Sequence, residues 1–379
     1  VGQLVERVKE ADAVLMLHMS GTGNEALSKI VQVGKPTALF SEPYSGHDWM
    51  YLPELRKQGK KVMLLPSSDR SEIERAVTLM RVPALLKRTR IIAWGPPQGT
   101  SAACSAELIK ERFGAEVISY TDAQVKDIWR SIDPAAAAAE AEEYWLPYAR
   151  KIVEPNREKI IEAAKLFLAV KQLMVREQAQ AIASCHCMGD PRACLTFSKL
   201  NDLGFVGGCE GDMDSTLTML LFAYAFRAPG FISDPVVDTA KNALLHFHCT
   251  SATKMDGPTG PRRPFEIRSQ CDSKAGVALE VEHRVGQAVT CAKLVNLDTL
   301  LVLPGKILET STNPMACRTQ FAQSVPNARK LFLNYGAGVI HGGTMALLHR
   351  AVFYGDFMEP LKDLCDLMSL KVIEEGGAA

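Results

Sequence analysis

Apolar and polar residues follow one another along the first part of the chain in an order typical of alternating strands and helices. ADAVLMLHMS, KPTALFSEP and KKVMLLP are short apolar runs of strand length, and NEALSKIVQVG has the apolar spacing of a helix that ends at Gly34. The intervening SGTGNEAL (20–27) predicts a tight strand-to-helix turn rather than an anion-binding loop. This βαβαβ order predicts a parallel, doubly wound sheet over residues 1–86.

The same rhythm continues over residues 87–228. RTRIIAWG, AEVISY and AQAIASCHC read as strands, and SAELIKERFG and REKIIEAAKLFLAVKQLMVREQ as helices. The Ala-rich stretch that follows Asp133 and Pro134 favours a surface helix, with these two residues in the N-cap and first helical positions. We therefore predict a second doubly wound α/β domain.

The pattern changes after about residue 228. Alternating or β-branched runs such as ALLHFHCTS, GVALEVEHRV, QAVTCAKLV and TLLVLPGKIL replace the helical segments, with Pro and Gly clustered between them. This spacing predicts a β-rich, barrel-like domain over residues 229–379. The expected fold class is α/β, with two doubly wound α/β domains followed by the β-rich C-terminal domain.

Charge and composition narrow the range of partners. The 379 residues include 43 Lys plus Arg and 43 Asp plus Glu, so the formal net charge is zero. This balance argues against nucleic acid or a membrane surface as a partner and favours small molecules or copies of the same chain. The apolar runs are too short or too interrupted to span a membrane. Ten scattered Cys suggest reduced thiols in a cytoplasmic protein.

An acidic cluster flanks an uncharged segment in GGCEGDMDSTLTMLLFAYAFRAPGFISDP, residues 207–235. Asp212 or Asp214 near the start of the expected helix would cap it, although D-x-D is also a pattern of metal-dependent glycosyl transfer. Capping does not explain Glu210 or Asp234, which stand in Gly-rich and apolar surroundings. Carboxylates are seldom buried without partners, and a divalent cation between two of them would remove their repulsion.

Histidines supply further candidates. SCHCMGDPRAC (184–194) lacks a second distant pair for a zinc site, so we expect a strand end and loop that face a pocket, with His186 lining it. His246 and His248 alternate on one expected strand and point the same way. His349 lies late in the chain, where it could return to the same cavity.

The segments CEGDMDSTLTMLL, APGFISDPVVD and NALLHFHC, in this order, resemble the L-fucose isomerase family, with L-arabinose isomerases as more distant relatives. LLHRAVFYGDFMEPLKDLCDLMSLKVIEE resembles the end of the same family. The resemblance covers roughly 170–255 and 330–379 and is only architectural over 1–170. CEGDMDST stands where the family has C-E-A-D-V-Y-G, and an added loop carries Lys254, Arg262 and Arg263. These residues suit a solvated loop or a site for an acidic sugar.

The resemblance implies a set of site residues. Glu210 and Asp234 would bind a divalent cation, Mn²⁺ or Mg²⁺, and take part in proton transfer. His349 would be a further ligand, and His248 a fourth ligand or a substrate contact. The resemblance also implies a homo-oligomer, a trimer or hexamer.

The function expected from these residues is a metal-dependent sugar isomerase that interconverts an aldose and a ketose through an ene-diolate. His248, His186 and Asp212 are the candidate substrate contacts. An epimerase using the same site, and a sugar-binding protein without turnover, are alternatives. A glycosyltransferase using Asp212 and Asp214 is a third.

Overall fold

The computed structural model describes residues 2–19, 25–271 and 273–376, so residues 20–24 of the turn expected at SGTGNEAL lie outside the described residues. The chain divides into two compact units. The first consists of Val1–Lys87, Asp298–Leu300 and Phe357–Val372, and the second of Arg88–Leu297, Leu301–Asp356 and Ile373–Ala379. The sequence-based division into three domains, 1–86, 87–228 and 229–379, stays a prediction.

The first unit contains the expected parallel sheet. Its strands pair in the order β1-β2-β3: β1 (Val14–His18), β2 (Thr37–Ser41) and β3 (Val62–Pro66). The helices of this unit are α1 (Gly2–Lys9), α2 (Glu25–Ile30), α3 (Leu52–Lys57), α4 (Glu72–Lys87) and α13 (Met358–Met368). Gly34, with a φ of 76°, ends the helical segment at the position the sequence predicts.

The second unit begins with a four-stranded parallel sheet. Its strands pair in the order β5-β4-β7-β8: β4 (Arg90–Trp94), β5 (Glu116–Tyr120), β7 (Ala181–Ser184) and β8 (Val206–Gly208). The helices that accompany it are α5 (Ala106–Phe113), α6 (Asp122–Ser131), α7 (Pro134–Tyr144), α8 (Arg157–Glu177) and α9 (Cys194–Asp202). The Asp133 side chain caps α7 by accepting the backbone N–H of Ala135, as predicted.

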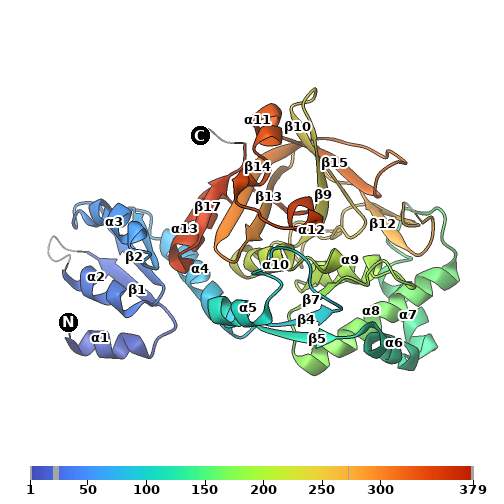
Figure 1. Ribbon diagram of the computed structural model, residues 1–379, viewed down its shortest axis with the longest axis horizontal. Helices are drawn as coiled ribbons and strands as arrows, with labels where there is room; N and C mark the ends of the chain where they lie inside the picture. Colours follow the sequence, from blue (N-terminus) through green and yellow to red (C-terminus); the bar gives the residue numbers. More distant parts are fainter. Residues whose placement is uncertain (1, 20–24, 272, 377–379) are drawn as a thin grey trace. The chain divides into compact units, whose positions relative to one another are not determined.

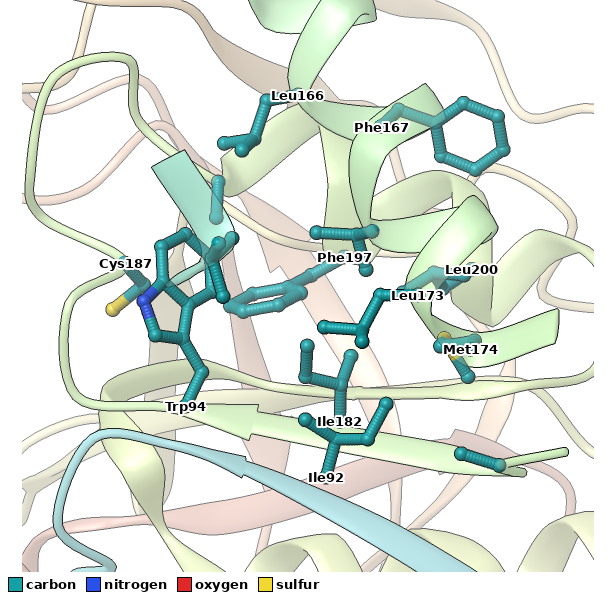
Figure 2. Close-up of a cluster of buried hydrophobic side chains, with 14 of the residues drawn as sticks. Ile92, Trp94, Leu166, Phe167, Leu173, Met174, Ile182, Cys187, Phe197 and Leu200 are labelled. Atoms are coloured by element: carbon teal, nitrogen blue, oxygen red, sulfur yellow. The ribbon is translucent and has the colours of Figure 1, made fainter. Parts of the chain in front are cut away.

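Apolar side chains from the sheet and from α8 and α9 form one core of this unit. Ile92 and Ile182 from the strands meet Leu173 of α8, and Phe197 of α9 lies among them (Figure 2). These four side chains are fully buried. Strands β4 and β7 are covered by helices, and this explains why their sequences are continuously apolar instead of alternating.

The later part of the second unit is a β-barrel. Six strands pair mainly antiparallel in the order β13-β16-β9-β10-β15-β14, and pairing of β13 with β14 closes the ring. They are β9 (Gly230–Asp238), β10 (Ala243–His248), β13 (Ala288–Val295), β14 (Thr299–Thr310), β15 (Thr319–Ser324) and β16 (Arg350–Tyr354), with β17 (Lys371–Glu374) added beside β14. A smaller sheet is formed by β6 (Lys151–Ile152), β11 (Phe265–Arg268) and β12 (Ala278–Val281).

Helix α10 (Met213–Phe226) connects the two parts of this unit. It packs against β7 and β8 of the parallel sheet and against β13 and β16 of the barrel (Figure 1). Burial on both sides explains why the segment carries no charge from Ser215 to Phe226. The predicted fold class, α/β domains with a β-rich barrel-like domain, is confirmed. In the described part of the chain, no helix is both long and apolar enough to cross a membrane.

Gly207 provides a test of this packing. A Cβ atom at this position would lie 2.7 Å from the Cα of Phe197, because α9 lies directly against β8. We expect Gly207→Ala to lower the free energy of unfolding by about 1–3 kcal/mol, measured by urea denaturation. Gly343→Ala, where no atom lies within 4 Å of the added carbon, should lose less than about 1 kcal/mol. Equal losses in both variants would contradict this account of the packing.

Candidate active site

The first part of the site lies at the carboxyl edge of the four-stranded parallel sheet. Strand β8 ends at Gly208 and runs into a 3-10 turn, Cys209–Gly211, just before α10. The loop after β4 holds this turn, because Gln98 donates its N–H to the carbonyl of Gly211 at 2.9 Å and accepts the N–H of Met213 at 2.9 Å. Ligand sites of parallel sheets are commonly found at this edge.

Glu210 sits in this turn with a strained backbone. Its φ is 56° and its ψ 18°, the left-handed region that favours glycine. Its N–H donates to the sulfur of Cys187 at 3.2 Å, and the Cys187 and Cys209 sulfurs are 3.4 Å apart. Strain of this kind persists where the surroundings hold a residue in place, and it concentrates at functional sites.

The second part of the site lies at the ends of adjacent barrel strands. Arg350 of β16 pairs with Ser233 of β9, so His349 and Asp234 stand beside each other across the two strands. Strand β10 pairs with the other side of β9 and ends at His248. Residues that are more than a hundred positions apart therefore converge through strand register.

The four predicted residues come together. The Nε2 atom of His349 lies 3.3 Å from Oδ1 of Asp234 and 3.4 Å from Oε2 of Glu210. The Nε2 atom of His248 lies 3.9 Å from Oε1 of Glu210. Possible ligand atoms of Asp234, His248 and His349 all lie within 4.8 Å of one another, and so do those of Cys209, Glu210 and His248.

Two polar atoms in this cluster have no hydrogen-bond partner in the described part of the chain. They are Oδ1 of Asp234 and Nε2 of His349, and both are buried. Buried polar atoms are nearly always hydrogen-bonded, so two that face each other require an explanation. A cation between them would supply it, and carboxylates with imidazole form a donor set that Mn²⁺ accepts. The residues therefore fit a divalent metal ion.

Asp212 lies behind His349 and holds it. It is fully buried. Its Oδ2 atom accepts hydrogen bonds from Nδ1 of His349 at 3.0 Å and from Nζ of Lys293 at 2.9 Å. Its Oδ1 atom accepts the N–H of Ser215 at 2.8 Å, so the expected capping of α10 is confirmed. With these donors in place, Asp212 presents no exposed oxygen to a substrate.

Charge and burial act against each other in this cluster. Burial opposes ionisation of Asp212, but Lys293 and then His349 lower its pKa well below the usual range. Burial likewise opposes ionisation of Asp234, and the imidazole of His349 and the charge of His248 lower its pKa. Burial disfavours the charged form of His349, yet its contacts with the surrounding carboxylates raise its pKa well above the ordinary value. Without a metal, these contacts thus favour ionised Asp212 and Asp234 and a protonated His349.

Asp214, the second acid of the D-x-D pattern, faces the protein interior. It is fully buried, and Thr100 donates both its backbone N–H and its hydroxyl, the latter at 2.7 Å. Burial and the charge of Asp212 raise the pKa of Asp214 to about 6. Neither acid of the pattern is therefore open to a nucleotide sugar.

His186 and His246 lie apart from the ligand clusters found among the described residues. His186 follows β7 and packs against Gly95, where a Cβ atom would come within 2.7 Å of its ring. His246 is buried between Ser233 and Gln323, each 3.0 Å from one of its ring nitrogens, and burial lowers its pKa to about 4. Whether His186 contacts a substrate stays a prediction.

The basic residues of the added loop are engaged within the protein. Lys254 donates to the carbonyl of Pro258 at 3.0 Å, and Arg263 to the carbonyl of Glu282 at 3.1 Å. The guanidinium of Arg262 lies 4.0 Å from the centre of the Tyr144 ring. These contacts favour a structured loop over an open anion site.

Sequence reasoning missed Lys293. Its side chain is 0% exposed, although it is surrounded in the sequence by the apolar residues of AVTCAKLV. The sequence did contain a signal for it, a single lysine within a predicted strand of mostly apolar residues. Such a lysine is expected to be buried and therefore to require an anionic partner.

These observations describe an α/β protein whose barrel and parallel sheet bring carboxylates and imidazoles into one partly buried cluster. No family model matches the chain. It is 23% identical over 321 residues to two sulfoquinovose isomerases, from Priestia aryabhattai and Priestia megaterium, with 78% of this chain and 67% of each relative covered. The chain is thus similar to sugar isomerases, while a specific relation to L-fucose isomerases stays a prediction.

The backbone of Glu210 gives a testable consequence. Glu210→Gly and Glu210→Ala both remove the carboxylate, but only glycine adopts the left-handed conformation without strain. We expect Glu210→Gly to be more stable than Glu210→Ala by about 1 kcal/mol, the reverse of the usual order, in urea unfolding. An alanine variant as stable as the glycine variant would show that the turn is not strained.

Proposed function

We propose that this chain is an aldose–ketose isomerase that acts on a small sugar and depends on a divalent metal ion. The observation that carries the proposal is the convergence of Glu210, Asp234, His248 and His349, in which Oδ1 of Asp234 and Nε2 of His349 are buried and have no hydrogen-bond partner among the described residues. The similarity to sulfoquinovose isomerases supports the reaction class.

Glu210, Asp234 and His349 would hold the ion, with His248 as a fourth ligand or a substrate contact. Mn²⁺ fits this mixture of oxygen and nitrogen donors, and Mg²⁺ is the alternative. When bound, such an ion polarises neighbouring oxygens and stabilises negative charge that develops on them.

The two carboxylates account for the proton transfer. One carboxylate removes the proton from C2 of an open-chain aldose, and the C–H electron pair forms the C1–C2 double bond while the carbonyl oxygen at C1 takes up the charge. Return of a proton to C1, with transfer of the hydroxyl proton at C2 to the charged oxygen on C1, gives the ketose. Glu210 and Asp234 retain 29% and 18% exposure of their side chains, so both can reach a substrate.

The surroundings of His349 maintain the geometry of this reaction. Asp212 accepts from Nδ1, so Nε2 is directed toward Glu210 and Asp234. A histidine oriented by a carboxylate is a common arrangement in metal sites, because the second hydrogen bond fixes both ring orientation and tautomer.

The substrate is a hexose that is either neutral or sulfonated. The relatives are named for a sulfonated sugar, which would fit an acidic substrate. Lys254, Arg262 and Arg263 are engaged within the protein, so a sulfonate would have to meet other groups or displace these contacts. We therefore propose testing neutral and sulfonated hexoses side by side.

The proposal is tested by incubating the protein with Mn²⁺ and a panel of aldoses and ketoses in D₂O. NMR should detect exchange of the C1 and C2 hydrogens together with formation of the partner sugar. Chelation should abolish both, and Mn²⁺ should restore them. Glu210→Gln and Asp234→Asn should each lower kcat by about 10²–10⁴-fold, because each removes a proton-transfer group.

Glu309→Gln is the matched control, since it makes the same acid-to-amide change at an exposed ion pair with Lys241 and should keep full activity. Full activity in both site variants would reject the assignment of the bases. Metal and sugar binding without any exchange would favour a sugar-binding protein, and inversion at one carbon without a carbonyl shift would favour an epimerase.

Metal binding should depend on pH. The pKa of His349 is raised without metal, so this residue carries a proton at neutral pH that must leave before Nε2 can act as a ligand. We expect proton release on Mn²⁺ binding and a Kd that rises by up to about tenfold per unit as pH falls. Calorimetry in buffers of different ionisation enthalpy measures the released proton. His349→Gln should abolish the release, and no release from the unmodified protein would contradict the assignment.

A further inference from the structure

Lys293 is a buried cation next to the proposed site. It lies on β13 with no exposed side-chain surface, and its Nζ atom donates to Oδ2 of Asp212 at 2.9 Å and to the carbonyl of Met345 at 3.4 Å. Lysine is rarely buried completely, and it is retained in an interior only with compensating partners. The cost of burying this residue is therefore offset at one carboxylate.

The same carboxylate oxygen contacts His349. Oδ2 of Asp212 lies 3.0 Å from Nδ1 of His349 and 2.9 Å from the hydroxyl of Ser215, while Oδ1 accepts the N–H of Ser215. Lys293 and His349 thus approach one atom from two different barrel elements. Any movement of the Asp212 carboxylate would change the orientation of the His349 ring.

Asp212 has a reason to move if Lys293 is removed. Asp214 is buried nearby, and its charge repels that of Asp212. The ammonium of Lys293 attracts the Asp212 carboxylate toward β13 and holds it within reach of His349. A serine hydroxyl and a backbone N–H supply no positive charge, and among the other described contacts of the Asp212 carboxylate only the imidazole of His349, the group to be positioned, can carry one.

We propose that Lys293 is a positioning residue that acts through Asp212 on His349. Its ammonium holds the Asp212 carboxylate where it accepts the Nδ1 hydrogen, which leaves Nε2 directed at Glu210 and Asp234. This inference rests on the proposed function for its consequence in catalysis, whereas the effect on the imidazole can be measured without metal.

The chain offers a matched control. Lys199 is also buried, with a side chain 8% exposed, and forms an ion pair with Glu140 outside the two ligand clusters. Lys199→Met and Lys293→Met therefore each leave a carboxylate that is at most 14% exposed without its lysine partner, and both should destabilise the fold. Only Lys293→Met should alter His349.

The first measurement uses ¹⁵N-histidine NMR of the metal-free protein, with the His349 signals identified by their loss in His349→Gln. The unmodified protein and Lys199→Met should show a hydrogen-bonded Nδ1–H for His349, and Lys293→Met should have lost it. An unchanged His349 signal in folded Lys293→Met would overturn the proposal.

The second measurement is Mn²⁺ affinity by calorimetry. Lys293→Met should bind Mn²⁺ about 10–100-fold more weakly, as expected when the partner that orients a ligand is disturbed, and Lys199→Met should bind within about twofold of the unmodified protein. Absence of Mn²⁺ binding in the unmodified protein would refute the proposed function while the NMR result still decides the role of Lys293.

If Lys293→Met does not fold, the double variant Lys293→Met/Asp212→Asn removes both charges of the pair and keeps a residue that can cap α10. It should fold and show the same loss of Mn²⁺ affinity. Wild-type affinity in the folded double variant would overturn the proposal.

Discussion

The carboxylate of Asp212 connects the main parts of the second unit. It caps α10, a helix enclosed by the parallel sheet and the barrel, whose first N–H groups have no access to water. It also accepts hydrogen bonds from Lys293, which lies on β13, and from His349, which directly precedes β16. One buried acid thus satisfies a helix end, compensates a buried cation and orients an imidazole.

In this arrangement, the buried charged groups of the cluster stabilise one another. The charges of Asp212 and Lys293 are fully buried at a cost that a neighbouring charge offsets, so neither group would be tolerated there alone. The left-handed backbone of Glu210 adds strain at the same place. The apolar cores elsewhere in the unit, such as that around Phe197, offset the unfavourable free energy of this strain and of the buried charges.

The distant similarity and the geometry contribute different information. An identity of 23% over 321 residues relates the chain to sugar isomerases, but it does not identify a substrate. The geometry describes groups that can bind a cation and move protons, and these groups are common to many sugars. The contacts of the Lys254–Arg263 loop within the protein mean that its charge, read from the sequence alone, is a poor guide to the substrate.

The sequence by itself determined the type of each major element and the residues most worth testing. Strands such as β2 and helix α10, which carries no charge from Ser215 onward, follow from apolar spacing, because backbone geometry imposes those periods locally. Glu210, Asp234 and His349 could be selected because polar groups at the ends of apolar segments require partners. Only the tertiary structure decided which partners they have. His246 and His248 share one strand and one spacing, yet one meets Gln323 and the other meets Glu210. Lys293 and its partner Asp212 are 81 positions apart, and residues 357–372 join the first unit rather than the barrel. Such contacts arise from strand register and long-range packing, which no local pattern encodes.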